Sequence, residues 1–194
     1  MKKILLVVVI IIFITLLLPL AIVWLIGGSG EGQSPIESGT VSVYVSEEDC
    51  VKDMDINEYL KCVVAAEMPA DFEEEALKAQ AVAARTYLYS HIAEKDKGNI
   101  AESHNGAAIC TDSTHCQAYI SEDKRRESWG AGAEENWNKI STAVDETTGQ
   151  IMTYNDEIIS AVFHSTSSGI TESAVDVWGA DVPYLQSVAS TGDK

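Results

Sequence analysis

A single glutamate, Glu67, stands in a setting that suits proton transfer. Its neighbours Ala65, Ala66, Met68 and Pro69 offer it no positively charged partner. A carboxyl group in apolar surroundings can stay protonated near neutral pH and then act as a general acid. A solvated glutamate at a helix end is the alternative, and periodicity alone favours it because perturbed carboxylates are the minority.

A second group of reactive side chains lies in the polar stretch 98–126. His104, Cys110, His115 and Cys116 are spaced H-x5-C-x4-H-C. Two imidazoles and two thiolates suit tetrahedral zinc, which would pin a loop that has no core of its own. A disulfide between Cys110 and Cys116 is the alternative if the domain lies outside the cell. The spacing does not decide between zinc and the disulfide.

A third group of polar residues follows a predicted strand and forms a small loop. It consists of His164, Ser165, Thr166, Ser168 and Gly169. No G-x-S-x-G elbow is present and no obvious acidic orienter precedes His164, so a serine hydrolase is disfavoured. Loops at strand ends commonly bind ligands, and we expect this loop to contact substrate rather than to be only a hydrogen-bonded turn. Trp178, in the loop-like segment 176–179, could stack on a sugar, although tryptophan is more often a core residue.

The first helix that positions Glu67 is predicted from local signals. Asp55 and Glu58 form a capping box, so the helix can begin near Ile56. Pro69 disfavours helical geometry in the residue before it, so the helix should end near 66–68. Glu67 is therefore expected at the end of this helix.

A second helix is predicted to begin at the capping box of Asp71 and Glu74 and to run to about Lys95. Lys78 and Arg85 are seven residues apart on it, which is two turns, so they share a face. We expect them to form a polar strip along the groove that Glu67 enters. A solvated stripe of long side chains is the alternative.

The remaining pattern indicates an α+β domain of helices packed on a small sheet, with 98–126 as a long loop inserted in it. Alternating residues predict strands, Asn155–Asp156 is a turn pair, and a third helix ends before Gly149. Predicted elements are strands at 41–45 and 51–54 joined as a hairpin, a helix at 133–147, and strands at 151–154 and 158–164.

The N-terminus predicts a membrane anchor. Residues 4–26 carry no charge over 23 positions, and Lys2 and Lys3 precede them. Such a run can span a bilayer, and the positive-inside rule places the following domain outside the cell. We expect an uncleaved single-pass anchor at 1–27 and a flexible linker at 28–40 rich in Gly, Ser and Glu. A cleaved signal peptide is the alternative.

The formal net charge of −17 excludes one class of partner. Nucleic acids require a basic surface on the protein that binds them, and this chain is strongly acidic. The charge also disfavours attraction to anionic wall polymers. Any recognition of a glycan is therefore expected to be local, through hydrogen bonds and stacking.

Three motifs resemble one family. E-M-P at 67–69 with E-A-L-K-A-Q-A-V-A-A-R-T-Y at 75–87 is similar to the signature of the stage II sporulation protein D family. F-H-S-T-S-S-G at 163–169 and D-V-W-G-x-x-V-P-Y-L-x-S-V at 176–188 are similar to the second signature block of that family. The resemblance covers about residues 41–190.

The resemblance implies a peptidoglycan lytic transglycosylase with Glu67 as the catalytic acid. It favours a substrate-binding role for Arg85, more weakly for Lys78, and it favours zinc over the disulfide. Four protein ligands would leave no position for a water, so we expect the zinc to be structural. The resemblance also implies a preference for glycan strands without stem peptides, and as partners a wall amidase such as stage II sporulation protein P and a membrane protein.

Two other classes of function stay open. Members of the family described as amidase enhancers suggest a non-catalytic wall-binding module. A metal-dependent hydrolase would need an open zinc position close to Glu67. The family also usually continues into a further Gly/His-rich segment, so we expect the catalytic domain at 41–194 to be incomplete at its C-terminus.

Overall fold

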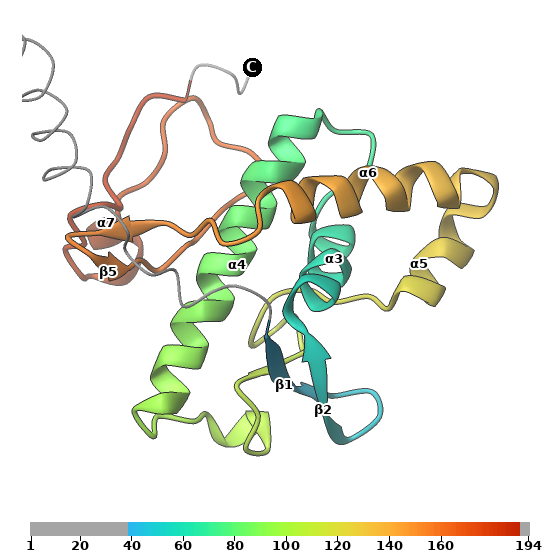
Figure 1. Ribbon diagram of the computed structural model, residues 1–194. Coiled ribbons are helices and arrows are strands. Elements are labelled where there is room, and N and C mark those ends of the chain that lie inside the picture. Colours follow the sequence, from blue (N-terminus) through green and yellow to red (C-terminus); the bar gives the residue numbers. More distant parts are fainter. Residues whose placement is uncertain (1–38, 191–194) are drawn as a thin grey trace, which may run out of the picture. The chain divides into compact units, whose positions relative to one another are not determined.

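The computed structural model describes residues 39–190 (Figure 1). Among these residues, no helix combines the length and the apolar character that crossing a membrane requires. The predicted anchor at 1–27 lies outside the described residues, as does the predicted linker except for its last two positions. Thr40, the last of these, already belongs to strand β1 (Thr40–Val45), so the linker prediction was one residue too long.

The small sheet has three strands in the order β2-β1-β3. β1 pairs antiparallel with β2 (Cys50–Asp55) and parallel with β3 (Ile109–Cys110). The predicted hairpin is confirmed, with Val45 opposite Cys50 and Asp49 in the turn at φ 50°. Alternate β1 valines are buried, as the period of a half-buried strand requires.

Two helices follow the hairpin. α3 (Ile56–Glu67) begins where the Asp55 side chain accepts hydrogen bonds from two backbone N–H groups, and it ends at the extended Met68, as predicted. α4 (Glu74–Asp96) begins later than the predicted capping box, because 69–72 form a turn in which the Phe72 N–H donates to the Pro69 carbonyl at 3.3 Å. Asp71 therefore does not cap α4, and Glu73 occupies the cap position without a side-chain bond.

The stretch 98–126 is more ordered than the predicted loop. It contains the 3-10 turn η2 (Glu102–His104), strand β3 and the first residues of α5 (Glu122–Trp129). A second 3-10 turn, η3 (Gly130–Gly132), leads into α6 (Ala133–Glu146), which confirms the predicted third helix. Strand β3 has only two residues, which is too short to show an alternating pattern in the sequence. It forms by pairing with β1, which is distant in the chain.

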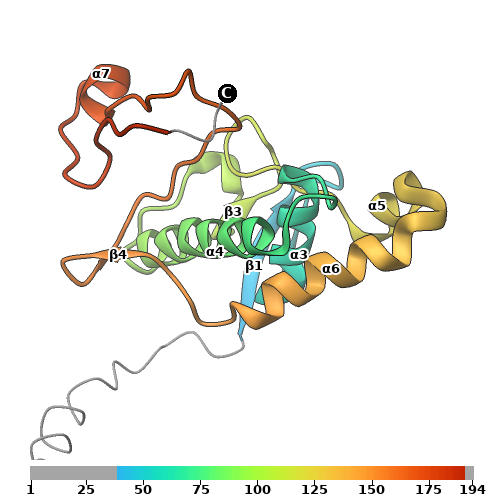
Figure 2. The ribbon, with the colours of Figure 1, turned by 90° about the horizontal axis from the view of Figure 1, so that it is seen from above.

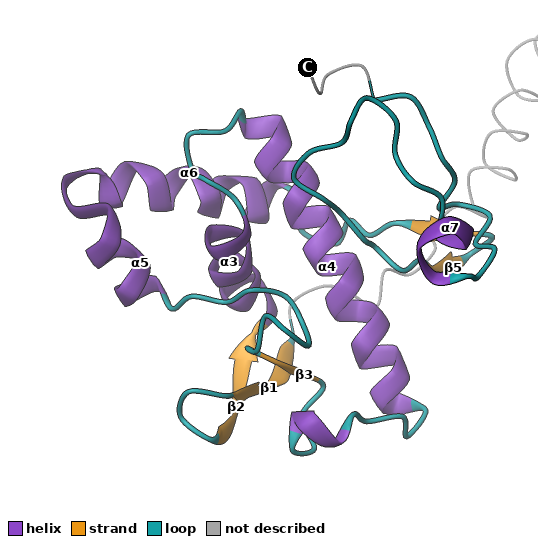
Figure 3. Ribbon diagram, turned by 180° about the vertical axis from the view of Figure 1, so that it is seen from behind, coloured by secondary structure: helices purple, strands orange, loops and turns teal. Residues whose placement is uncertain are grey.

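The core lies where α3 packs against α4 and α6, with α5 against α6 (Figures 1 and 3). Trp137, Ile140 and Val144 form the buried face of α6, as their spacing predicts. The small residues Ala81 and Ala84 of α4 are fully buried, which lets the helices approach closely. Cys62 is buried beside them, and burial raises its pKa to about 11.

The chain then forms a short hairpin of β4 (Thr153–Tyr154) and β5 (Glu157–Ile158). Its turn is as predicted, since Asn155 and Asp156 have φ of 51° and 65°. The strands are much shorter than predicted, and 159–164 is not a strand, because no further strand lies beside this two-stranded ribbon in the part of the chain that the structure describes. The hairpin packs on α4, where the Met152 N–H donates to Thr86 Oγ1 at 3.0 Å.

Residues 169–190 fold back on themselves (Figure 2). The Thr171 N–H donates to the Val188 carbonyl at 2.9 Å and the Ala174 N–H to the Leu185 carbonyl at 2.8 Å. These bonds hold the one-turn helix α7 (Ala174–Trp178), where a loop was predicted. Few apolar side chains are buried in this segment, so it is held mainly by its backbone bonds.

Candidate active site and metal centre

Glu67 is the last residue of α3 and is half-buried. Its Oε1 accepts a hydrogen bond from the Ala118 backbone N–H at 2.8 Å. The carboxylate is therefore held by the insertion, 51 residues later in the chain. Sequence reasoning missed Ala118, because a backbone donor can belong to any residue type except proline.

The segment that supports Glu67 is itself fixed on α3. The Ile120 N–H donates to the Cys62 carbonyl at 3.4 Å. The Tyr119 ring stacks on Tyr59, with centroids 5.8 Å apart and planes at 17°. The Ala118 donor is thus kept in register with the end of the helix.

The prediction that Arg85 lines an open groove was wrong. Arg85 lies in the interior, with 1% of its surface exposed. Its guanidinium donates to the Thr147 carbonyl at 2.6 Å and to the Val144 carbonyl at 2.9 Å. The last carbonyls of a helix lack partners within it and attract a cation. Arg85 therefore joins α4 to the C-terminal end of α6.

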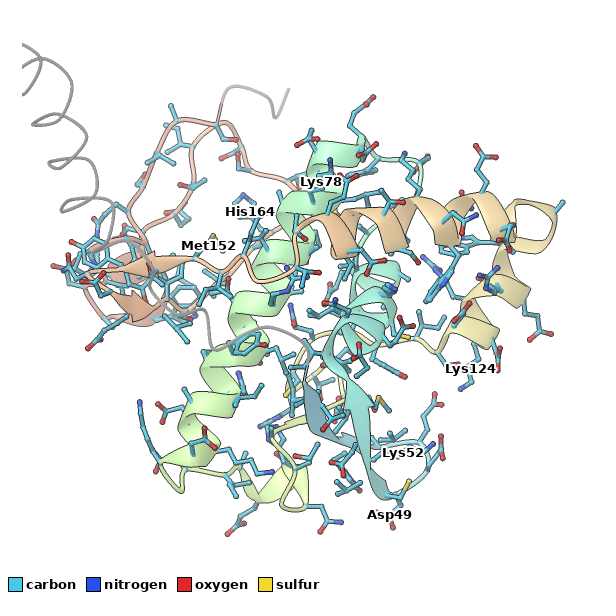
Figure 4. All side chains as sticks on the ribbon, viewed as in Figure 1. Asp49, Lys52, Lys78, Lys124, Met152 and His164 are labelled. Atoms are coloured by element: carbon cyan, nitrogen blue, oxygen red, sulfur yellow. The ribbon has the colours of Figure 1, made fainter. Side chains whose placement is uncertain are left out.

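Lys78 and Arg85 both reach α6, Lys78 through Glu146 and Arg85 through Val144, and Figure 4 shows Lys78 near the N-terminal part of α4. The Lys78 ammonium group lies 2.8 Å from Glu74, 3.0 Å from Glu75 and 2.7 Å from Glu146. Hydrogen bonds to these carboxylates, that of Glu146 foremost, raise the pKa of Lys78. Lys78 borders a cavity of about 420 Å³ whose lining does not include Glu67.

Replacing Arg85 with alanine is expected to destabilise the fold. The change removes charge-assisted hydrogen bonds from buried carbonyls and leaves a cavity, with a cost of about 3 kcal/mol in the free energy of unfolding. Urea unfolding followed by circular dichroism measures it. Lys78→Ala, on the same face but at the surface, should change the unfolding midpoint little, and equal midpoints for the two variants would contradict this role for Arg85.

Part of the third predicted group comes together at a cavity of about 560 Å³. His164, Thr166, Ser168 and Trp178 all line it, and Trp178 is 60% exposed. We call this cavity the C-terminal cavity. Other side chains in its lining, which the sequence did not indicate, include Phe163, Glu172 and Tyr184.

Two members of the third group do not line the C-terminal cavity. Ser165 is exposed beside it. Gly169 has φ of 97° and accepts a hydrogen bond from the Ser190 N–H at 2.9 Å, so it shapes the backbone of the loop. Figures 1 and 3 show α3 and α7 on opposite sides of α4. The lining of the C-terminal cavity does not include Glu67.

The predicted metal ligands lie together. One donor atom from each of His104, Cys110, His115 and Cys116 lies within 4.8 Å of the others. His104 Nε2 is 3.0 Å from His115 Nδ1 and 3.2 Å from Cys116 Sγ, and Cys110 Sγ is 3.6 Å from His115 Nδ1. Ligands of tetrahedral zinc stand about 3.3–3.8 Å apart. The separations here lie within a few tenths of an ångström of that range or allow it, and two imidazoles with two thiols are a donor set that suits zinc. Cys110 and Cys116 are both free thiols in the structure.

Local structure brings the two adjacent ligands to one point. The His115 and Cys116 N–H groups both donate to the Asp112 carbonyl, at 3.1 and 2.7 Å, and the Asp112 carboxylate accepts from the Thr114 N–H at 2.8 Å. His115 Nε2 lies 3.1 Å from the Ser103 hydroxyl, the kind of outer contact that orients a ligand imidazole.

Burial shifts the pKa of two members of this cluster, Cys116 and His104. It raises the pKa of the Cys116 thiol to about 12, and together with His115 and His91 it lowers the pKa of His104. The imidazole is thus kept in the neutral form that binds metals. A divalent cation would offset the cost of burying a thiolate.

The sequence is similar to proteins of one family. The family model described as stage II sporulation protein matches residues 44–154. Two relatives, each named stage II sporulation protein D, come from Bacillus amyloliquefaciens and Bacillus subtilis (strain 168). Both are 39% identical, over 162 and 168 residues, or 84% and 86% of this chain.

A third relative is a Bacillus subtilis (strain 168) protein named amidase enhancer, which is 37% identical over 134 residues. These cover 69% of this chain and 15% of that protein. The matches cover 45% and 48% of the two sporulation proteins, so the chain spans about half of their length. Since the family model covers more than half of the chain, the chain belongs to the stage II sporulation protein D family.

Proposed function

We propose that this protein is a lytic transglycosylase that cleaves peptidoglycan glycan strands, preferably without stem peptides, during the wall remodelling and engulfment of sporulation. Family membership supports the sporulation context. The observation that carries the reaction is the Glu67 carboxyl group, positioned at a helix end by the Ala118 N–H.

The proposed reaction needs one carboxyl group, whereas most glycosidases use two. Glu67 donates its proton to the glycosidic oxygen between N-acetylmuramic acid and N-acetylglucosamine, and the bond from that oxygen to the muramyl C1 breaks. The muramyl 6-hydroxyl oxygen then bonds to C1, and its proton returns to Glu67. The product is a 1,6-anhydro ring, and no water is consumed. Since Ala118 binds Oε1, Oε2 is the oxygen that carries the proton.

We assign a structural role to a zinc ion held by His104, Cys110, His115 and Cys116. Four protein ligands fill a tetrahedral site and leave no position for a reacting water. When bound, the ion would fix the insertion that carries the Ala118 donor. This ligand count also speaks against the metal-dependent hydrolase.

Product analysis tests the proposed reaction. Purified peptidoglycan, treated with an amidase to remove its stem peptides, is digested with the protein and examined by mass spectrometry. Anhydro-muramyl ends are expected, and reducing muramyl ends would instead indicate hydrolysis. The absence of any cleavage by a form of the protein as long as the two sporulation relatives would move the assignment to the enhancer function.

The C-terminal cavity is proposed to bind the glycan, with Trp178 as a stacking surface. Trp178→Ala is expected to weaken binding of denuded glycan strands about 3- to 10-fold, because aromatic contacts contribute about 0.5–1.5 kcal/mol. Co-sedimentation with the strands measures this. Val175→Ala, also exposed on α7 but outside the cavity lining, is the matched control. Equal binding by the two variants would remove Trp178 from the site.

A second candidate function is enhancement of a wall amidase, such as stage II sporulation protein P. The relative named amidase enhancer suggests it, and so does a C-terminal cavity whose lining does not include Glu67. A module of this kind would stimulate the amidase equally well with Glu67→Gln. A membrane protein is proposed as a further partner.

We also propose that the protein is anchored in the cell membrane by residues 1–27, with its domain on the outer side. The uncharged run after Lys2 and Lys3 supports this topology. Protease added to intact protoplasts is expected to remove the domain and leave a small membrane-bound fragment. A domain that survives the protease until the protoplasts are lysed would contradict the topology.

A further inference from the structure

A cavity of about 320 Å³ leads to the proposed metal centre, and we call it the imidazole cavity. The side chains of His104 and His115 line it, whereas those of Cys110 and Cys116 do not. Glu94 in its lining is exposed, so the cavity opens to solvent. A metal ion that arrives through the imidazole cavity therefore meets the two imidazoles before it meets the thiols.

A third histidine, His91 of α4, lines the same cavity and is not one of the four predicted ligands. Its ring lies 6.2 Å from that of His104. Its Nδ1 lies 2.9 Å from the Tyr87 carbonyl oxygen, which can only accept a hydrogen bond, so Nδ1 carries the proton. In the neutral ring, Nε2 then carries the lone pair, and no hydrogen bond to it occurs among the described residues. An imidazole nitrogen of this kind is a common metal ligand.

The charged side chains that line the imidazole cavity are already engaged. The Glu94 carboxylate pairs with Lys97 at 2.8 Å. The Lys95 ammonium group donates to Ser42 Oγ at 2.7 Å. The opposite charges of Glu94 and Lys95 also cancel, so an arriving cation is offered a lone pair by His91 rather than a strong field.

The size of the imidazole cavity suits an ion that has not yet lost its water. One water molecule takes up about 30 Å³ of liquid, so about 320 Å³ can hold a zinc ion together with the waters it still carries. A first bond to His91 would keep the ion beside the cluster while His104 and His115 replace the remaining waters.

We propose that His91 is a transfer ligand, whose Nε2 binds zinc in the imidazole cavity and passes it to His104 and His115. This inference rests on the proposed zinc site. Only metal–ligand bonds form and break, and His91 is not bound to zinc in the loaded centre. A group that acts only along the path lowers the barrier in both directions. His91 therefore speeds loading and release by the same factor and leaves the affinity unchanged.

The test is the rate of zinc loading and of zinc release by the full chain, followed by stopped flow with a chromophoric chelator, for the wild type and His91→Asn. The asparagine amide can keep the bond to the Tyr87 carbonyl, but it has no atom in the place of Nε2. Both rates should fall about tenfold, which corresponds to about 1.4 kcal/mol in the barrier, and the equilibrium affinity should equal that of the wild type. His164→Asn is the matched control, because His164 is not in the lining of the imidazole cavity. It should load and release zinc at the wild-type rates.

A second variant tests the path without changing a histidine. Ala101 is half-buried in the lining of the imidazole cavity, so Ala101→Leu narrows the cavity. Loading and release should again slow by one common factor, with the affinity unchanged. Wild-type rates for this variant would overturn entry through the cavity.

The outcomes separate the transfer role from the zinc site itself. A wild type that binds no zinc would overturn both. If the wild type binds zinc and His91→Asn loads and releases it at the same rates, the transfer role alone fails. It also fails if His91→Asn binds zinc more weakly because release is faster, since His91 would then hold the ion in the loaded centre.

Discussion

Replacing Glu67 with glutamine is expected to reduce the release of anhydro-muramyl products about 100-fold or more. A positioned acid–base group typically accelerates a reaction by about 10²–10⁴. Glutamine keeps the shape of the side chain and can still accept the Ala118 hydrogen bond, but it cannot donate and recover a proton. Binding of glycan strands should therefore be retained. Rates are measured by mass spectrometry of the products, and binding by co-sedimentation.

The matched control for this variant is Glu73→Gln. Glu73 is an exposed glutamate at the start of α4, and no side-chain bond joins it to the helix cap. It should keep nearly the full rate, which would show that the loss at Glu67 does not come from a change in surface charge. A Glu67→Gln protein that forms anhydro products at the wild-type rate would refute the assignment.

Removal of the metal is expected to have the second large effect. A ligand that binds only the folded state at 1,000 times its dissociation constant stabilises it by about 4 kcal/mol. Chelation should therefore lower the melting temperature by roughly 8–16 °C for a domain of this size. The insertion should open first, since its own buried apolar residues are few, and hydrogen exchange would show faster exchange at 98–126.

Substitutions of single cysteines control for non-specific effects of the chelator. Cys110→Ser should abolish zinc binding and reproduce the lower melting temperature. Cys50→Ser should leave both unchanged, because Cys50 lies at the start of β2 and is not one of the four ligands. A Cys110–Cys116 disulfide found by mass spectrometry in the native protein would contradict the metal site.

The sequence by itself determined the elements whose signals are local. The Asp55 cap, the break at Pro69 and the turn at Asn155–Asp156 each depend on residues within a few positions of one another, so α3, its end at Glu67 and the β4–β5 turn could be predicted. The buried face of α6 follows in the same way from its helical period. The residue types and spacing of the metal cluster, and the family motifs, were also visible in the sequence.

Only the tertiary structure decided which distant groups meet. A basic residue at helical spacing looks the same in sequence whether it faces solvent or the end of another helix, so the burial of Arg85 against α6 could not be predicted. The pairing of β3 with β1, the bond from Ala118 to Glu67 and the position of the C-terminal cavity likewise join residues far apart in the chain. Such contacts depend on how whole elements pack, and neither the period nor the propensity of a single segment encodes that packing.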